Sequence, residues 1–117
     1  MQKVTIWHNP RCSKSRETLA LLQERHIEPE IVEYLKAPPS TTEIERALKL
    51  LGMEARGLMR DNEDAYEATH ANDPALSRGQ LVQLMHEHPA LIQRPVVIVG
   101  ERARIGRPPE AVLEILP

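Results

Sequence analysis

Two hydrophobic periods alternate along the chain and predict its helices and strands. The β-branched and aromatic run Val4–Trp7 is typical of a buried strand. Leucines spaced among charged residues then predict a helix near Ser15–Arg25. A second strand is expected over Glu30–Tyr34. This β-α-β unit predicts two parallel strands joined by a right-handed crossover.

The middle of the chain predicts helices and no strand. Ser40–Glu43 and Ser77–Gln80 each have the capping-box pattern that opens a helix. The first helix is expected to stop at Gly52 and the second at Pro89, while residues 53–75 hold polar turns. The inward faces are expected to carry Ile44, Leu48 and Leu51 in the first helix and Leu81, Leu84 and Met85 in the second.

The last quarter of the chain predicts a hairpin followed by a helix. Val96–Val99 is the most strand-like stretch, and a turn separates it from a short return strand at Ala103–Ile105. Pro108-Pro109 stands where prolines start helices, so a closing helix is expected. Its apolar positions are Ala111, Leu113, Ile115 and Leu116. The order βαβ, helical insert, ββα predicts one α/β domain over residues 1–117, with a mixed four-stranded sheet.

Composition narrows the class of protein. The chain has 117 residues, 41% of them hydrophobic, and its net charge of −2 gives no basic footprint for nucleic acid. No apolar stretch approaches the length of a membrane span. Because a strand pattern begins directly at the N-terminus, no signal peptide is expected. One cysteine excludes an internal disulfide. We therefore expect a soluble cytoplasmic protein with a reduced thiol.

That cysteine, Cys12, is the strongest candidate for chemistry. It lies between the first strand and the first helix, where the helix dipole and unpaired backbone N–H groups favour a thiolate. The alternative is a small buried hydrophobic residue, which calls for apolar neighbours. Residues 9–16 are instead polar or turn-forming, and three of them are cationic. We interpret Cys12 as a nucleophile.

Two neighbours could tune this thiol. His8 ends the first strand and, as an imidazolium, would favour the thiolate; it could equally be a solvated histidine. Ser15 occupies the place of the second sulfur in a CxxC motif, where it could donate to the thiolate or cap the helix. Because serine cannot resolve a disulfide, any redox cycle needs an external thiol. The other histidines form no metal-ligand pattern, so no metal is expected.

Three arginines stand at junctions between predicted elements. Arg60 follows the second helix, Arg94 precedes the third strand, and Arg107 precedes the last helix. Each could be an ordinary solvated charge. If they converge on Cys12, their planar guanidinium groups would bind a tetrahedral oxyanion.

Four sequence blocks, in order, carry a family resemblance: HNPRCSKSR, LMRDNEDAY, HPALIQRPVVIVG and RIGRPPEAVLEIL. They resemble the glutaredoxin-linked arsenate reductases, a family with a thioredoxin-like fold. The resemblance covers nearly the whole chain and includes Cys12 in HNPxC together with Arg60, Arg94 and Arg107. One departure is Ser13-Lys14, where Gly-Thr is commoner in the family; Lys14 adds charge near the anion site.

The resemblance implies a function in arsenic detoxification. Cys12 would attack arsenate, the three arginines would hold the oxyanion, and His8 and Ser15 would tune the thiolate. Glutathione would be the co-substrate and glutaredoxin the protein partner, with no bound cofactor. The Arg94-Pro95 peptide bond would be cis. The alternatives are a regulator of the same fold that binds RNA polymerase, and a reductase of another oxyanion or of a glutathione adduct.

Overall fold

The computed structural model describes residues 3–117, which divide into two compact units. Unit 1 comprises residues 3–37 and 94–117, and unit 2 comprises residues 38–93. The expectation of a single domain over residues 1–117 stays a prediction. None of the helices over residues 3–117 has both the length and the apolar character needed to cross a bilayer.

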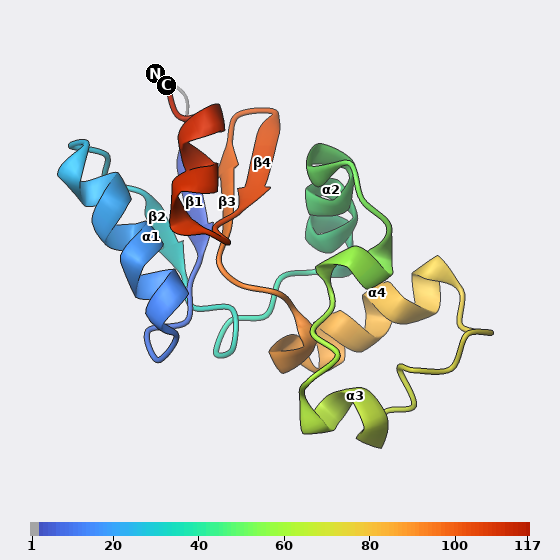
Figure 1. The fold of residues 1–117 in the computed structure, drawn as a ribbon. Helices are drawn as coiled ribbons and strands as arrows, with labels where there is room; N and C mark the ends of the chain where they lie inside the picture. Colours follow the sequence, from blue (N-terminus) through green and yellow to red (C-terminus); the bar gives the residue numbers. More distant parts are fainter. Residues whose placement is uncertain (1–2) are drawn as a thin grey trace. The chain divides into compact units, whose positions relative to one another are not determined.

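Unit 1 is built on a four-stranded sheet with the order β2-β1-β3-β4 (Figure 1). The strands are β1 (Val4–Trp7), β2 (Glu30–Val32), β3 (Val96–Val99) and β4 (Arg102–Ile105). β2 runs parallel to β1, whereas β3 is antiparallel to both β1 and β4. The expected mixed sheet of a thioredoxin-like fold, with a helical insert between its second and third strands, is confirmed.

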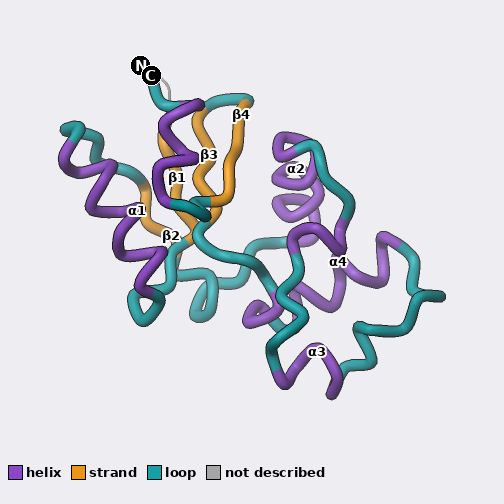
Figure 2. Tube along the Cα trace, viewed as in Figure 1, coloured by secondary structure: helices purple, strands orange, loops and turns teal. Residues whose placement is uncertain are grey.

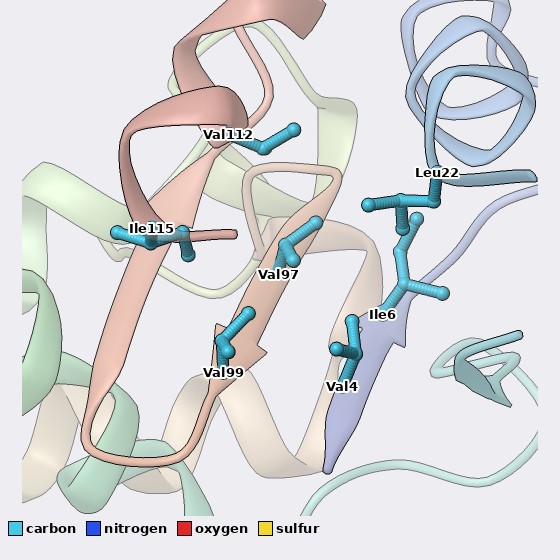
Figure 3. Packing of buried hydrophobic residues seen from close by; sticks show 7 residues of the cluster. All are labelled: Val4, Ile6, Leu22, Val97, Val99, Val112 and Ile115. Atoms are coloured by element: carbon cyan, nitrogen blue, oxygen red, sulfur yellow. The ribbon is translucent and has the colours of Figure 1, made fainter. Parts of the chain in front are cut away.

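The core of unit 1 lies between the sheet and two helices. Helix α1 (Ser13–Glu24) and the 3-10 helix η3 (Pro109–Ile115) pack beside each other on the sheet. Figure 3 shows the side chains of this core directed toward one another from the strands and both helices. The cluster consists of Val4, Ile6, Leu22, Val97, Val99, Val112 and Ile115. All seven side chains of this cluster are aliphatic.

The closing helix differs from its expected form. It begins after Pro108 as expected, but it winds as a 3-10 helix whose buried residues are Pro109, Val112 and Ile115. A 3-10 helix has three residues per turn, so positions i and i+3 face the same way. Of the apolar positions expected in the closing helix, Ile115 is buried, and Ala111, Leu113 and Leu116 are half-buried.

Unit 2 consists of helices and loops (Figure 2). Its helices are α2 (Thr41–Leu51), η1 (Ala55–Leu58), α3 (Asp64–Ala68), α4 (Arg78–Glu87) and η2 (Pro89–Leu91). Both capping boxes are present, since Ser40 and Ser77 each accept from the backbone N–H three residues on. Gly52 ends α2 with a φ of 69°, a left-handed conformation that glycine adopts without strain. The boundaries of α2 and α4 confirm the expected ones, whereas η1 and α3 lie within residues 53–75, where polar turns were expected.

Three smaller expectations need correction. The second strand stops at Val32 and does not reach Tyr34, because the chain turns where the Glu33 carbonyl accepts from Lys36 and Ala37. The buried residues of α4 are Leu81, Val82 and Met85, while Leu84 is only half-buried. In α2, Leu51 is also half-buried.

Candidate active site

A short turn carries Cys12 from the end of β1 to the start of α1. The Cys12 N–H donates to the Asn9 carbonyl at 3.0 Å, and the Asn9 side-chain oxygen accepts from the Arg11 N–H at 3.0 Å. Arg16, one turn into the helix, donates through Nη1 to the Pro10 carbonyl at 3.0 Å. These bonds fix the turn, so the partly exposed thiol has a defined place at the helix N-terminus.

Cys12 is the N-cap residue of α1. An N-cap side chain faces the first unpaired N–H groups of its helix, which usually bond to a serine or aspartate oxygen. Here no side-chain hydrogen bond of that kind forms within the described chain, and the first turn of α1 holds no acidic residue. The backbone N–H groups of Ser15 and Lys14 instead act on the sulfur and stabilise its charged form.

Opposing effects set the pKa of the Cys12 thiol. Burial is the largest and raises the pKa. The Ser15 N–H, the hydrogen bond and charge of Arg94, and the Lys14 N–H together outweigh burial and lower the pKa of Cys12 below its ordinary value. The structure thus favours the thiolate, which is the nucleophilic form of cysteine.

Sheet register brings two of the arginines to the cysteine. Trp7, at the end of β1, pairs with Val96 at the start of β3, and Val96 also pairs with Ile105 at the end of β4. The segments that carry Cys12, Arg94 and Arg107 therefore meet at one end of the sheet.

Arg107 links the two arginine segments to the sulfur. Its Nε donates to the Arg94 carbonyl at 2.8 Å, and its Nη2 lies 3.6 Å from Cys12 Sγ. The Arg107 guanidinium is exposed, so solvent screens its charge. The arginine that lowers the pKa of the Cys12 thiol is Arg94. The Arg94-Pro95 bond is cis, as the resemblance implied, and the Arg107-Pro108 bond is cis as well.

His8 and Ser15 form a buried pair behind the cysteine turn. Nδ1 of His8 lies 2.6 Å from Oγ of Ser15, and this oxygen also accepts from the Asn9 N–H at 3.0 Å. Burial lowers the pKa of His8; the Glu33 carboxylate raises it and the Arg16 charge lowers it, with a net decrease. The neutral ring is favoured, and its Nδ1 can accept the Ser15 hydroxyl proton.

This pairing differs from both suggestions made from the sequence. A neutral His8 supplies no positive charge to the thiolate. The Ser15 hydroxyl bonds to His8 and Asn9, and it is the Ser15 backbone N–H that acts on Cys12. The pair therefore shapes the turn that holds the cysteine.

Arg60 lies in unit 2. Its backbone N–H donates to the Leu91 carbonyl at 2.7 Å, and its Nε lies 3.5 Å from a Glu63 carboxylate oxygen. The side chain is 13% exposed, and its buried Nη1 has no hydrogen-bond partner among residues 3–117. A buried guanidinium nitrogen of this kind is suited to an anionic ligand.

The ammonium group of Lys14 pairs with Glu17 and not with the Cys12 sulfur. Its Nζ lies 3.6 Å from the Glu17 carboxylate on the exposed side of α1.

Residues 3–117 contain no group of three or more His, Cys, Asp or Glu side chains that could hold a metal ion.

Comparison with known proteins decides the family. The ArsC family profile matches residues 7–115, which include every element of the site. The chain belongs to the ArsC family. It is 52% identical to the Uncharacterized protein YfgD of Escherichia coli K12, over 98% of both chains. It is 48% identical to a Haemophilus influenzae protein named arsenate reductase, over 97% of this chain and 98% of the relative.

A solved structure supports the same assignment. An arsenate reductase from Vibrio cholerae matches this ArsC-family chain with a TM-score of 0.95 at 49% identity, covering 98% of each chain.

Sequence reasoning missed two buried polar residues of this ArsC-family site. Asn9 is 9% exposed and bonds both to the turn and to Ser15. Thr18 is fully buried, and its hydroxyl donates to the Lys14 carbonyl at 2.8 Å. For Thr18 the spacing gave a hint, since Ser15, Thr18 and Leu22 recur every three or four residues and form the buried face of α1. Asn9 precedes the helix, and this spacing does not include it.

Proposed function

We propose that this ArsC-family protein reduces arsenate to arsenite, using Cys12 as the nucleophile and glutathione and glutaredoxin as electron donors. One observation carries the proposal. The thiol of Cys12, the single cysteine of the sequence, has a lowered pKa and lies beside the guanidinium groups of Arg94 and Arg107. The names of the Haemophilus and Vibrio relatives support arsenate as the substrate. The cytoplasm is the proposed compartment, because its glutathione pool keeps thiols reduced.

In the first step, the Cys12 thiolate attacks the arsenic atom of bound arsenate. A sulfur–arsenic bond forms, and one oxygen leaves as water after protonation. Arg94 and Arg107 stabilise the negative charge on the remaining oxygens, because guanidinium groups form charge-assisted, two-point contacts with such anions. His8, Ser15 and Asn9 keep the cysteine turn in the geometry this attack requires.

Two electrons then pass to arsenic. A glutathione thiolate attacks the adduct and forms a disulfide with the Cys12 sulfur, while the electron pair of the broken sulfur–arsenic bond stays on arsenic as As(III). Arsenite leaves. The glutaredoxin thiolate attacks the glutathione sulfur of the mixed disulfide and releases the Cys12 thiolate. An external thiol is essential because the chain has no second cysteine.

Arg60 is proposed as the third oxyanion ligand. Support comes from its buried Nη1 without a partner among residues 3–117 and from its backbone bond to Leu91, three residues before Arg94 in the chain.

A coupled assay tests the nucleophile. NADPH consumption is measured with arsenate, glutathione, glutathione reductase and glutaredoxin. We expect the parent protein to turn over arsenate and Cys12→Ser to be inactive, because a serine hydroxyl is not ionised at neutral pH and cannot form the disulfide. Substantial turnover by Cys12→Ser would refute the role of Cys12.

The same assay tests the anion pocket. Arg60→Ala, Arg94→Ala and Arg107→Ala should each lower kcat/KM by about 10- to 100-fold, the loss of one charged hydrogen-bonding group worth ~1.5–3 kcal/mol. Arg102→Ala is the control, since Arg102 is an exposed arginine of β4. Unchanged kcat/KM in all three site variants would refute the proposed oxyanion pocket.

A substrate panel separates the alternatives. A reductase of another oxyanion or glutathione adduct would turn over that compound in preference to arsenate. A regulator that binds RNA polymerase would show no turnover and would retain polymerase subunits in a direct pulldown.

A further inference from the structure

Gly106 occupies a place in unit 1 that has no room for a side chain. It is buried between the end of β4 and the start of η3. A Cβ atom at Gly106 would lie 2.5 Å from Thr18 Oγ1 and 2.8 Å from Pro95 Cγ, and 3.2 Å from Thr18 Cγ2. Ordinary carbon contacts begin near 3.4 Å, so any larger residue would push the segment away from its neighbours.

The neighbours of Gly106 belong to the segments that carry Cys12, Arg94 and Arg107. Thr18 lies in α1, the helix whose N-terminus carries Cys12, and bonds to the Lys14 carbonyl. Pro95 follows Arg94, and its carbonyl accepts from the Gly106 N–H at 2.9 Å. Arg107 follows Gly106 directly. The three segments that form the site therefore pack together at this glycine.

We propose that Gly106 is a positioning residue: because it has no side chain, the segment that carries Arg107 packs against Thr18 and Pro95, and this packing holds the Arg94 and Arg107 guanidinium groups at the Cys12 sulfur. The inference deepens the proposed function, and its catalytic consequence rests on that function. The geometry around the thiol can be tested without it.

The arginine contacts are sensitive to a small shift. Arg107 Nη2 lies 3.6 Å from Cys12 Sγ, an ordinary distance for a hydrogen bond to the large sulfur atom, and a displacement of about 1 Å would break this contact. A methyl group at Gly106 would have to gain about 1 Å of separation from Thr18 Oγ1. Movement of Pro95 would carry Arg94 with it, and Arg94 is one of the groups that stabilise the thiolate.

The test measures the Cys12 thiol in Gly106→Ala. The rate of alkylation by iodoacetamide is followed against pH, and circular dichroism checks the fold. Since a nearby cation lowers a pKa by about 1–3 units, partial loss of the arginines should raise the measured pKa by about one unit. Alkylation at a pH below both pKa values should then slow by about tenfold.

Gly79→Ala is the matched control. Gly79 lies in α4, and a Cβ there would meet nothing within 4 Å. The same added methyl group should leave the alkylation profile unchanged. If Gly79→Ala raised the pKa of the Cys12 thiol as much as Gly106→Ala does, the effect would be a general one of glycine replacement, and the proposal would be overturned.

A second variant tests the packing itself. Thr18→Ala removes Oγ1 and Cγ2, so Thr18→Ala/Gly106→Ala should return part of the way toward the parent pKa, while the contact with Pro95 remains. If Gly106→Ala does not fold, the double variant is compared with Thr18→Ala alone, and a raised pKa is again expected. An unchanged pKa in folded Gly106→Ala, or a double variant no closer to the parent than the single one, overturns the proposal.

The two proposals fail in different ways. A parent protein that does not reduce arsenate ends the proposed function and leaves the alkylation comparison valid. A parent that reduces arsenate, with the same thiol pKa in Gly106→Ala, ends the role of Gly106 alone.

Discussion

At the scale of residues, the site depends on polar groups that are buried and paired. The His8 ring, the Ser15 hydroxyl and the Asn9 N–H satisfy one another behind the cysteine turn. Each of these groups would cost free energy if it were buried alone. Because they are paired, the turn can remain rigid while Cys12 itself stays partly exposed for reaction.

The buried His8 makes stability depend on pH. Burial lowers the pKa of His8 in the folded protein from its ordinary value of 6.5, so in the window just below pH 6.5 the unfolded chain holds more protons. The free energy of unfolding should therefore fall as the pH drops through this window. One proton can contribute at most ~1.4 kcal/mol per pH unit.

Urea denaturation between about pH 5 and pH 8 measures this effect. His8→Asn should show a shallower pH dependence over that range than the parent. His88→Asn, at an exposed histidine, serves as the control and should keep the parent slope. Equal slopes for the parent and His8→Asn would contradict the assignment.

At the scale of elements, the end of α1 shows a residue in an unfavourable conformation. His26 has a φ of 61°, in the left-handed region. Its N–H donates to the Gln23 carbonyl and the Ile27 N–H to the Leu22 carbonyl, both at 3.0 Å. This is the Schellman arrangement, in which glycine is the preferred residue at the position of His26.

Glycine at this position should stabilise the protein. His26→Gly relieves the left-handed strain of a residue with a Cβ, worth about 1 kcal/mol, partly offset by the greater freedom of glycine in the unfolded chain. We expect a gain of roughly 0.5 kcal/mol in the free energy of unfolding. Gln23→Gly, inside the same helix, should instead cost about 1 kcal/mol. A loss of stability in His26→Gly would contradict the prediction.

At the scale of the whole molecule, the sheet of unit 1 joins the two ends of the sequence. β1 lies between β2 and β3, and the core combines Val4, Ile6 and Leu22 with four residues after position 96. The same pairing gathers Cys12, Arg94 and Arg107 at one end of the sheet. Folding of unit 1 and assembly of its part of the site therefore depend on the same contacts.

A pair of isoleucines tests this core. Ile6 and Ile31 are partners in the register of β1 and β2, but Ile6 is 0% exposed and Ile31 is 46% exposed. Ile6→Ala should lower the free energy of unfolding by about 2–5 kcal/mol, because it leaves a cavity. Ile31→Ala should lower it by less than about 1 kcal/mol. Urea denaturation followed by the fluorescence of buried Trp7 gives both values; similar losses would contradict the packing.

Much of the fold could be predicted because its local patterns are explicit. The β-branched runs became β1 and β3, and both capping boxes open helices as expected. The failures arose where tertiary packing selects among similar local options. The closing segment carries apolar residues at nearly every position, so its spacing did not distinguish an α-helix from the 3-10 helix that buries Pro109, Val112 and Ile115.

The sequence by itself determined the order of the four strands with α1, α2 and α4, and the placement of Cys12 at a helix N-terminus, because these follow from interactions within a few residues. Only the tertiary structure decided which distant groups reach the sulfur. Strand pairing brings Arg94 and Arg107 to Cys12 from positions more than 80 residues away. It also decided that His8 is buried and neutral, since burial depends on neighbours that local sequence does not specify.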